Sequence, residues 1–234
     1  MPWRGALKAV WLKADEPGRL CHSDWMAKLF EGLSFNAIGY DYGRTLMTLS
    51  DTLTATEQGI AGKRAAAELD LAAYNAGGQF IGEREEEIIL WEQSDVYEFD
   101  IELLDESLIA LRKSYVILFY HSWERMVGRW AKVASRANHD ELVAGMEKQG
   151  IKKHPRLDAV RDLNNALKHN SKAFGKALLK SWPEVLPPGY ALPADYDNPA
   201  IRPDWFEIIT ITPDIIQEVV ATLRASGPEG FPKS

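Results

Sequence analysis

The feature that most constrains this chain is the absence of proline between Pro17 and Pro155, a stretch covering more than half of its 234 residues. Proline breaks helix interiors because its ring removes a backbone donor and clashes with the preceding turn. Within this stretch, apolar residues recur at steps of three, four or seven from about Asn36 to Asn75, as on one face of a helix. The sequence therefore predicts a long helix there, packed in a bundle.

A second helical region is predicted from about Glu83 to Ala137, after a turn at Gly77 and Gly78. About 55 residues is too long for one helix of a globular protein. We therefore expect an interruption between residues 94 and 100, followed by a central helix over residues 100–134.

Shorter elements follow. Asn138 and Glu141 have the spacing of a capping pair, and Gly150 closes the short helix that they begin. Pro155 fits the first turn of the next helix, whose buried stripe is Leu157, Val160, Leu163 and Leu167. Asn170 and Ser171 end that helix and cap a basic one that reaches Trp182.

The end of the chain has a different pattern. Residues 183–204 are rich in Pro, Gly, Asp and Asn, which indicates a loop. Residues 205–212 alternate and are β-branched, which predicts a short strand. Thr212 then begins a final amphipathic helix, and residues 227–234 are expected to be a disordered tail.

The predicted fold class is all-α: a helical bundle with long antiparallel helices and a short C-terminal β-strand plus helix. We expect residues 1–35 to form an irregular segment with a short helix near residues 23–32, and residues 36–182 to form the bundle. Residues 183–226 supply the loop, strand and helix that pack on it, ahead of the tail at 227–234.

The composition of the chain argues against several classes of protein, including secreted and membrane-spanning ones. The chain has a single cysteine, Cys21, which excludes an internal disulfide and fits a reducing compartment. Acidic residues and Pro17 near the start argue against a secretion signal. No stretch approaches 18 apolar residues, so no membrane span is expected. We therefore predict a cytoplasmic protein, and its net charge of −7 argues against general nucleic-acid binding.

The charge is unevenly distributed. Residues 83–106 hold eleven acidic residues and one basic residue, a net charge of −10, whereas residues 148–180 carry a net charge of +7. The basic segment can be a solvated face, or it can face a polyanion, the acidic segment of its own chain, or that of a partner subunit.

One group of polar residues in the basic segment points to chemistry. Arg161, Asn165 and His169 are each four residues apart and share a helix face, with Asn164 at its margin. Histidine is the side chain best tuned for proton transfer near neutral pH, and an arginine can hold a phosphate and stabilise developing charge. The alternative is structural, because a histidine in the last turn of a helix interacts favourably with the helix dipole.

His121 and Glu124 form a second candidate. They are three residues apart on the central helix, the spacing of metal ligands in helical bundles. A di-metal site needs a second such pair, which the sequence lacks, so we expect no metal and no cofactor. Their predicted role is polar contact with the Arg161–His169 face.

These residues lie in segments that resemble a known family. Residues 163–186 (LNNALKHNSKAFGKALLKSWPEVL), preceded by residues 114–130 (SYVILFYHSWERMVGRW), resemble the HEPN superfamily, above all members tied to abortive infection and phage defence. The family signature is an Arg followed four to six residues later by a His, often as R-N-x3-H. His169 and Asn165 match it, Asn164 stands at the Arg position, and Arg161 lies about one turn earlier. The pattern-level resemblance covers about residues 100–224.

The resemblance implies an all-α bundle that is often a dimer, in which two late helices face each other to form one composite site. Active members are metal-independent endoribonucleases that leave a cyclic phosphate, whereas others have lost the motif and serve as interaction modules. The expected function is RNA cleavage in phage defence or as a toxin, with His169 for proton transfer, Arg161 for phosphate charge, and Asn165 and Asn164 for orientation. The further expectations are RNA binding by Lys168, Lys172 and Lys176, support from Glu124 and His121, a homodimer, and an antitoxin or other protein partner. The alternative is a non-catalytic helical interaction module.

Overall fold

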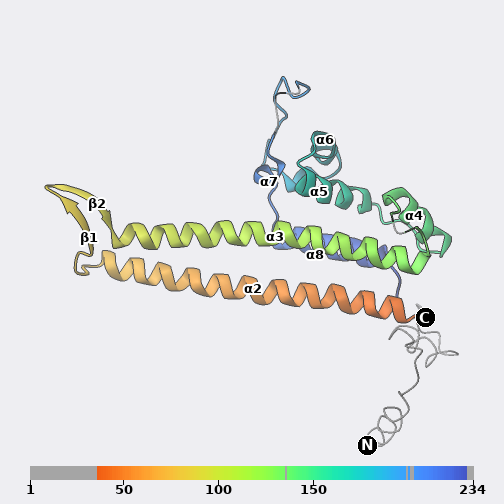
Figure 1. Cartoon of the computed structure of the whole chain (residues 1–234), viewed down its shortest axis with the longest axis horizontal. Coiled ribbons are helices and arrows are strands. Elements are labelled where there is room, and N and C mark those ends of the chain that lie inside the picture. The colour runs from red at the N-terminus through yellow and green to blue at the C-terminus, as the bar shows by residue number, and fades with distance from the viewer. Residues whose placement is uncertain (1–35, 135, 199, 201–202, 231–234) are drawn as a thin grey trace, which may run out of the picture.

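A computed structural model of the chain describes residues 36–134, 136–198, 200 and 203–230. Two long antiparallel helices form a hairpin, and shorter helices gather beside one end of it (Figure 1). The predominantly all-α prediction is confirmed. In the described part of the chain, no helix combines the length and apolar character needed to cross a membrane.

The hairpin consists of α2 (Ala37–Asn75) and α3 (Gln93–Ala131), each of 39 residues and so about 58 Å long at 1.5 Å per residue. The α2 helix begins where the Asn36 side chain accepts hydrogen bonds from the backbone N–H groups of Ile38 and Gly39. The predicted helix over residues 36–75 is therefore confirmed.

The tip of the hairpin corrects the sequence prediction. Residues 82–92 form two antiparallel strands, β1 (Gly82–Glu85) and β2 (Ile88–Glu92), and α3 then runs from Gln93 without the interruption expected at 94–100. The run Ile88–Trp91 is β-branched and aromatic, which favours a strand. Asp95 accepts a hydrogen bond from the Glu92 N–H at 2.8 Å and so caps the start of α3.

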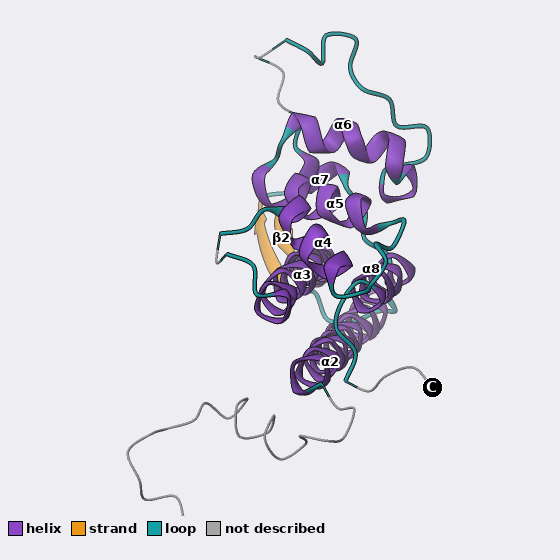
Figure 2. Ribbon diagram, turned by 90° about the vertical axis from the view of Figure 1, so that its right-hand side faces the viewer, coloured by secondary structure: helices purple, strands orange, loops and turns teal. Residues whose placement is uncertain are grey.

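The core lies at the other end, the base of the hairpin. Around it pack α4 (His139–Lys148), α5 (Leu157–His169), α6 (Lys172–Ser181), the 3₁₀ turn η1 (Pro183–Val185), α7 (Trp205–Ile208) and α8 (Pro213–Ala225). Figure 2, which looks along the hairpin, shows α8 beside both long helices. Asn138 and Glu141 form the predicted capping box at the start of α4. The buried aromatic side chains of this core are Tyr42, Phe119, Tyr120, Trp123, Trp182, Tyr196 and Trp205.

The strand predicted at residues 205–212 is wrong. The first four residues form α7, because the Asp204 side chain accepts a hydrogen bond from the Phe206 N–H and caps a helical turn. The remaining residues alternate in burial, with Ile209 and Ile211 buried. Among the described residues they pair with no other strand. The alternation is therefore real, but it serves an extended connection to α8.

The carboxyl-terminal residues 227–230 are ordered against α2, so the predicted disorder is wrong for them. The backbone N–H of Asn36 donates to the Gly230 carbonyl at 2.9 Å. Gly227 lies against the Tyr42 ring, where a Cβ atom would come within 2.2 Å of the ring. Residues 231–234 and the short helix predicted near residues 23–32 lie outside the described residues.

Candidate functional site

The α5 helix positions the predicted site. Its apolar stripe is buried as predicted, with Leu157, Val160 and Leu163 fully covered and Leu167 nearly so. Arg161, Asn165 and His169 follow one another along another side of the helix. Arg161 and Asn165 are half-buried and His169 is exposed. His169 is eight positions after Arg161, about 12 Å along the helix axis.

Asn164, at the Arg position of the family motif, lies on the covered side of α5. It is 5% exposed, and its Nδ2 donates to Asn165 Oδ1 at 3.2 Å. Asn164 therefore belongs to the packed interior, and its side chain contacts the predicted site only through Asn165.

The Arg161 guanidinium is held by carboxylates. Its Nε donates to Asp162 Oδ1 at 2.9 Å, and Nη1 lies 3.8 Å from Asp140. Burial raises the pKa of Asp162 although Arg161 opposes that shift. Burial also disfavours the charged guanidinium, but the bond to Asp162 outweighs it and the pKa of Arg161 is raised. Arg161 is therefore a cation with a fixed orientation at the rim of the core.

His169 is the most accessible member of the group. It is the last residue of α5, and within the described residues its ring makes no hydrogen bond or ion pair. The adjacent Asn170 has a left-handed backbone with φ 49°, and its Oδ1 accepts from the Trp205 N–H at 2.7 Å. The end of α5 is therefore anchored to α7 while the imidazole faces solvent.

Two of the three lysines expected to bind RNA have other partners. The Lys172 Nζ donates to the carbonyls of Tyr196 and Asn198 at 2.8 and 2.6 Å, and Lys176 lies 3.5 Å from Asp197. They hold the loop before α7 against α6. Lys168 is exposed, and it is the one of the three without such a partner among the described residues.

His121 and Glu124 pair with each other at 3.6 Å. Among the described residues, no hydrogen bond or ion pair joins either of them to α5, where the sequence placed their partners. They instead line a hollow of about 460 Å³ at the base of α3, together with Arg125, Gly128 and Arg129. In the described part of the chain, no three His, Cys, Asp or Glu side chains are grouped closely enough to hold a metal ion.

The sequence does not predict a relay that joins three helices and is buried at Tyr120 and His139 but partly exposed at Asp158. The Tyr120 hydroxyl of α3 is 2.8 Å from His139 Nδ1 of α4, and His139 Nε2 is 3.0 Å from Asp158 Oδ1 of α5. Lys153 donates to the other Asp158 oxygen at 2.5 Å. His139 is also within ring-contact distance of Trp123, with centroids 5.6 Å apart. The capping pair at Asn138 was the available signal, because it fixes His139 as the first residue of α4.

Burial sets the protonation of this relay. It lowers the pKa of His139, against the opposing effect of Asp158, and it raises the pKa of Tyr120. Burial also acts to raise the pKa of Asp158, but the hydrogen bonds from Lys153 and His139 outweigh it and lower that pKa. The relay therefore consists of a neutral imidazole between a phenol and a carboxylate.

The relay makes stability depend on pH. A histidine whose pKa is lower in the folded than in the unfolded state stabilises the fold above its unfolded pKa of about 6.5, and that contribution is lost as pH falls through the folded value. We expect the urea midpoint to fall between pH 7.5 and pH 5.5, and His139→Gln to reduce this fall. His121→Gln, at an exposed histidine, should leave it unchanged. An equal fall in His139→Gln and the original chain would contradict this assignment.

Comparisons with known proteins supply no family: no family model matches the chain, and no curated protein or solved structure matches it significantly. The chemistry of the described side chains is therefore the remaining guide to function. An exposed imidazole can transfer a proton, an arginine of fixed orientation can bind a phosphate, and an amide between them can orient a ligand.

Proposed function

We propose that this chain is a HEPN-like, metal-independent endoribonuclease acting in phage defence or as a toxin, with the exposed side of α5 as its catalytic surface. The supporting observation is that Arg161, Asn165 and His169 lie in register along that side, with the imidazole open to solvent. Lys168 lies next to His169 and adds a second cation. The resemblance of residues 163–186 to the family supports the same proposal.

The chemistry needs only these side chains. The ribose 2′-oxygen attacks the adjacent phosphorus as His169 accepts its proton, and the bond from phosphorus to the 5′-oxygen breaks. The products are a 2′,3′-cyclic phosphate and a 5′-hydroxyl, whose proton comes from an acid. Arg161 neutralises charge on the non-bridging oxygens, which are most negative in the transition state.

One copy of α5 offers a single exposed imidazole, whereas this reaction needs both a base and an acid. A second copy of the chain supplies the second His169 if the two α5 surfaces lie close together. The proposed active form is therefore a homodimer, in agreement with the composite site that the resemblance implies.

The direct test uses purified full-length chain and a structured RNA in the presence of EDTA. The expected result is cleavage that leaves 2′,3′-cyclic phosphate and 5′-hydroxyl ends, detected by end-specific labelling. Folding is monitored by circular dichroism in the same buffer. A folded chain that cuts no RNA in EDTA, or that cuts only after addition of a divalent metal, contradicts the proposal.

A second candidate function is a non-catalytic interaction module within a defence or toxin–antitoxin complex. The observation that favours it is the exposure of large apolar side chains along the hairpin, including Phe99 at 63% and Ile88 at 67%. Such concentrations on a protein surface mark interaction sites. This function predicts co-purification of a partner protein together with no RNA cleavage.

A further inference from the structure

The free side of α3 changes character along its length. Facing away from α2 and from the core, it carries Val96, Phe99 and Leu103 near the tip, all at least 41% exposed. Ser107, Ala110 and Ser114 follow in the middle, and all three are exposed. His121, Arg125 and Gly128 continue the same side at the base. The steps of three and four residues place all of them on one side of the helix.

The charge along this side also reverses. Of the acidic residues in the tip half of α3, Asp95, Asp100 and Glu106 lie on or beside this side and are exposed, whereas Asp105 faces α2 and pairs with Arg64. The exposed charges at the base are mostly basic: Arg125, Arg129 and Lys132. Between the acidic segment 83–106 and the basic segment 148–180 of one chain, no ion pair occurs in the described part of the structure. The acidic tip is therefore not neutralised by its own chain's basic helices.

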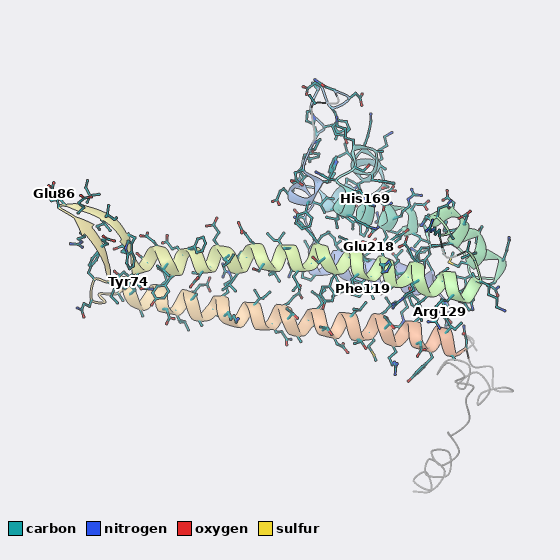
Figure 3. All side chains as sticks on the ribbon, in the orientation of Figure 1. Tyr74, Glu86, Phe119, Arg129, His169 and Glu218 are labelled. Carbon is teal, nitrogen blue, oxygen red and sulfur yellow. The ribbon has the colours of Figure 1, made fainter. Side chains whose placement is uncertain are left out.

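The shape of this side of α3 also changes from the tip to the base. The apolar side chains near the tip project, the side chains in the middle are small, and the base is hollowed beside Gly128 by the cavity of about 460 Å³. The back wall of this hollow is apolar, formed by Val133, Ala134, Ala137 and Leu142. Figure 3 shows how far apart the two ends lie, with Glu86 at the tip and Arg129 at the base.

We propose that two copies of this chain pair along this side of α3, antiparallel, so that the tip half of each helix lies on the base half of the other. A two-fold axis at the middle of α3, at the level of residue 112, brings residues whose numbers sum to about 224 opposite each other. Phe99 then lies by Arg125 and Val96 by Gly128 in the hollow. Asp100 lies near Arg125 on the same flank of the pair, and Ala110 faces Ser114, where small side chains allow close approach.

A second copy is the occupant that these observations favour. Two-fold symmetry places the same patch on both subunits, so a self-complementary surface is required. This side of α3 meets that requirement. In an antiparallel pair, the acidic tip of one copy lies against the basic base of the other, and the projecting apolar side chains lie against the hollow. A parallel pairing would instead set acidic tip against acidic tip, which is repulsive.

The pairing also bears on the α5 surface, a step that rests on the proposed function. Lys113, in the middle of α3, donates to the Phe206 carbonyl of α7, and α7 in turn holds Asn170 through Trp205. The end of α5 with His169 is therefore tied to the middle of α3. In the antiparallel pair both His169 ends therefore lie at the level of the two-fold axis along the helices.

Disulfide mapping tests the pairing. In a Cys21→Ser background the chain has no other cysteine, so Phe99→Cys and Arg125→Cys can be introduced together. These positions are 26 residues apart on one helix, about 39 Å, too far for a bond within one chain. The expected result is a covalent dimer on mild oxidation, with no dimer from either single substitution. Covalent dimers from the single Phe99→Cys variant would indicate parallel pairing and overturn the proposal.

Light scattering after size exclusion provides the second measurement. The unmodified chain is expected to be a dimer, and Phe99→Glu a monomer with unchanged helix content, because position 99 is exposed. If the unmodified chain is a monomer, the pairing is wrong, and the exposed apolar side chains near the tip would bind a different protein. A dimer that cross-links as expected but cuts no RNA keeps the pairing and contradicts the enzyme. A monomer that cuts RNA overturns the pairing and the two-copy site, and keeps only the cleavage activity.

Discussion

His169→Ala is expected to reduce RNA cleavage by about 10²–10⁴-fold, the usual contribution of a residue that transfers a proton in the transition state. The imidazole is exposed and makes no hydrogen bond or ion pair among the described residues, so its removal should leave the fold intact. The measurement is the single-turnover cleavage rate in EDTA, alongside the urea midpoint of both proteins. Cleavage at the original rate by a folded His169→Ala chain would remove α5 as the catalytic surface.

The matched control is His154→Gln, which removes another imidazole from the loop at the opposite end of α5. His154 Nδ1 accepts a backbone hydrogen bond from Arg156 at 3.3 Å, which the glutamine oxygen can also accept. This variant should cleave at the original rate. Arg161 is a poorer position to test first, because its removal would leave the buried Asp162 carboxylate without its cation and would lower stability together with activity.

Gly175→Ala should cause the largest loss of stability of any single methyl addition in α6. A Cβ at this position would lie 1.8 Å from Trp205 Cε2, and Trp205 is fully buried. Overpacking a rigid core typically costs about 1–3 kcal/mol, and we expect the upper part of that range. The measurement is the free energy of unfolding from urea titration.

Gly59→Ala is the control for that substitution. It makes the same change inside α2, where no atom lies within 4 Å of the new Cβ. Alanine favours helix over glycine, so this variant should be more stable by roughly 0.4–1 kcal/mol. Equal effects of the two substitutions would mean that Trp205 does not pack against α6 as the structure places it.

The fold was predictable where local pattern decides it. The apolar repeat of α2, the capping box before α4 and the buried stripe of α5 each follow from residues close together in the chain. The tip was not predictable in the same way, because the acidic run Glu83–Glu87 resembles a helix start. The β-branched run that follows it forms a strand only because β1 lies opposite.

The candidate site was likewise predictable only where the residues lie close together in the chain. The spacing of Arg161, Asn165 and His169 predicts a shared side of one helix, and the structure places them so. The relay from Tyr120 through His139 to Asp158 joins residues 19 positions apart at each step, on three different helices. Periodicity within a helix carries no information on such contacts, nor on the loop carbonyls that engage Lys172.

The last helix, α8, closes the core, so the core can form only late during synthesis. Tyr42 donates to the Leu223 carbonyl at 2.8 Å, and the Trp123 indole donates to the Ser226 carbonyl at 2.6 Å. A chain still emerging from the ribosome can form the α2–α3 hairpin, since its two helices are close in sequence. Its aromatic core, however, stays open until residues 213–230 have been made. We therefore expect the core to close only after residues 213–230 have left the ribosome.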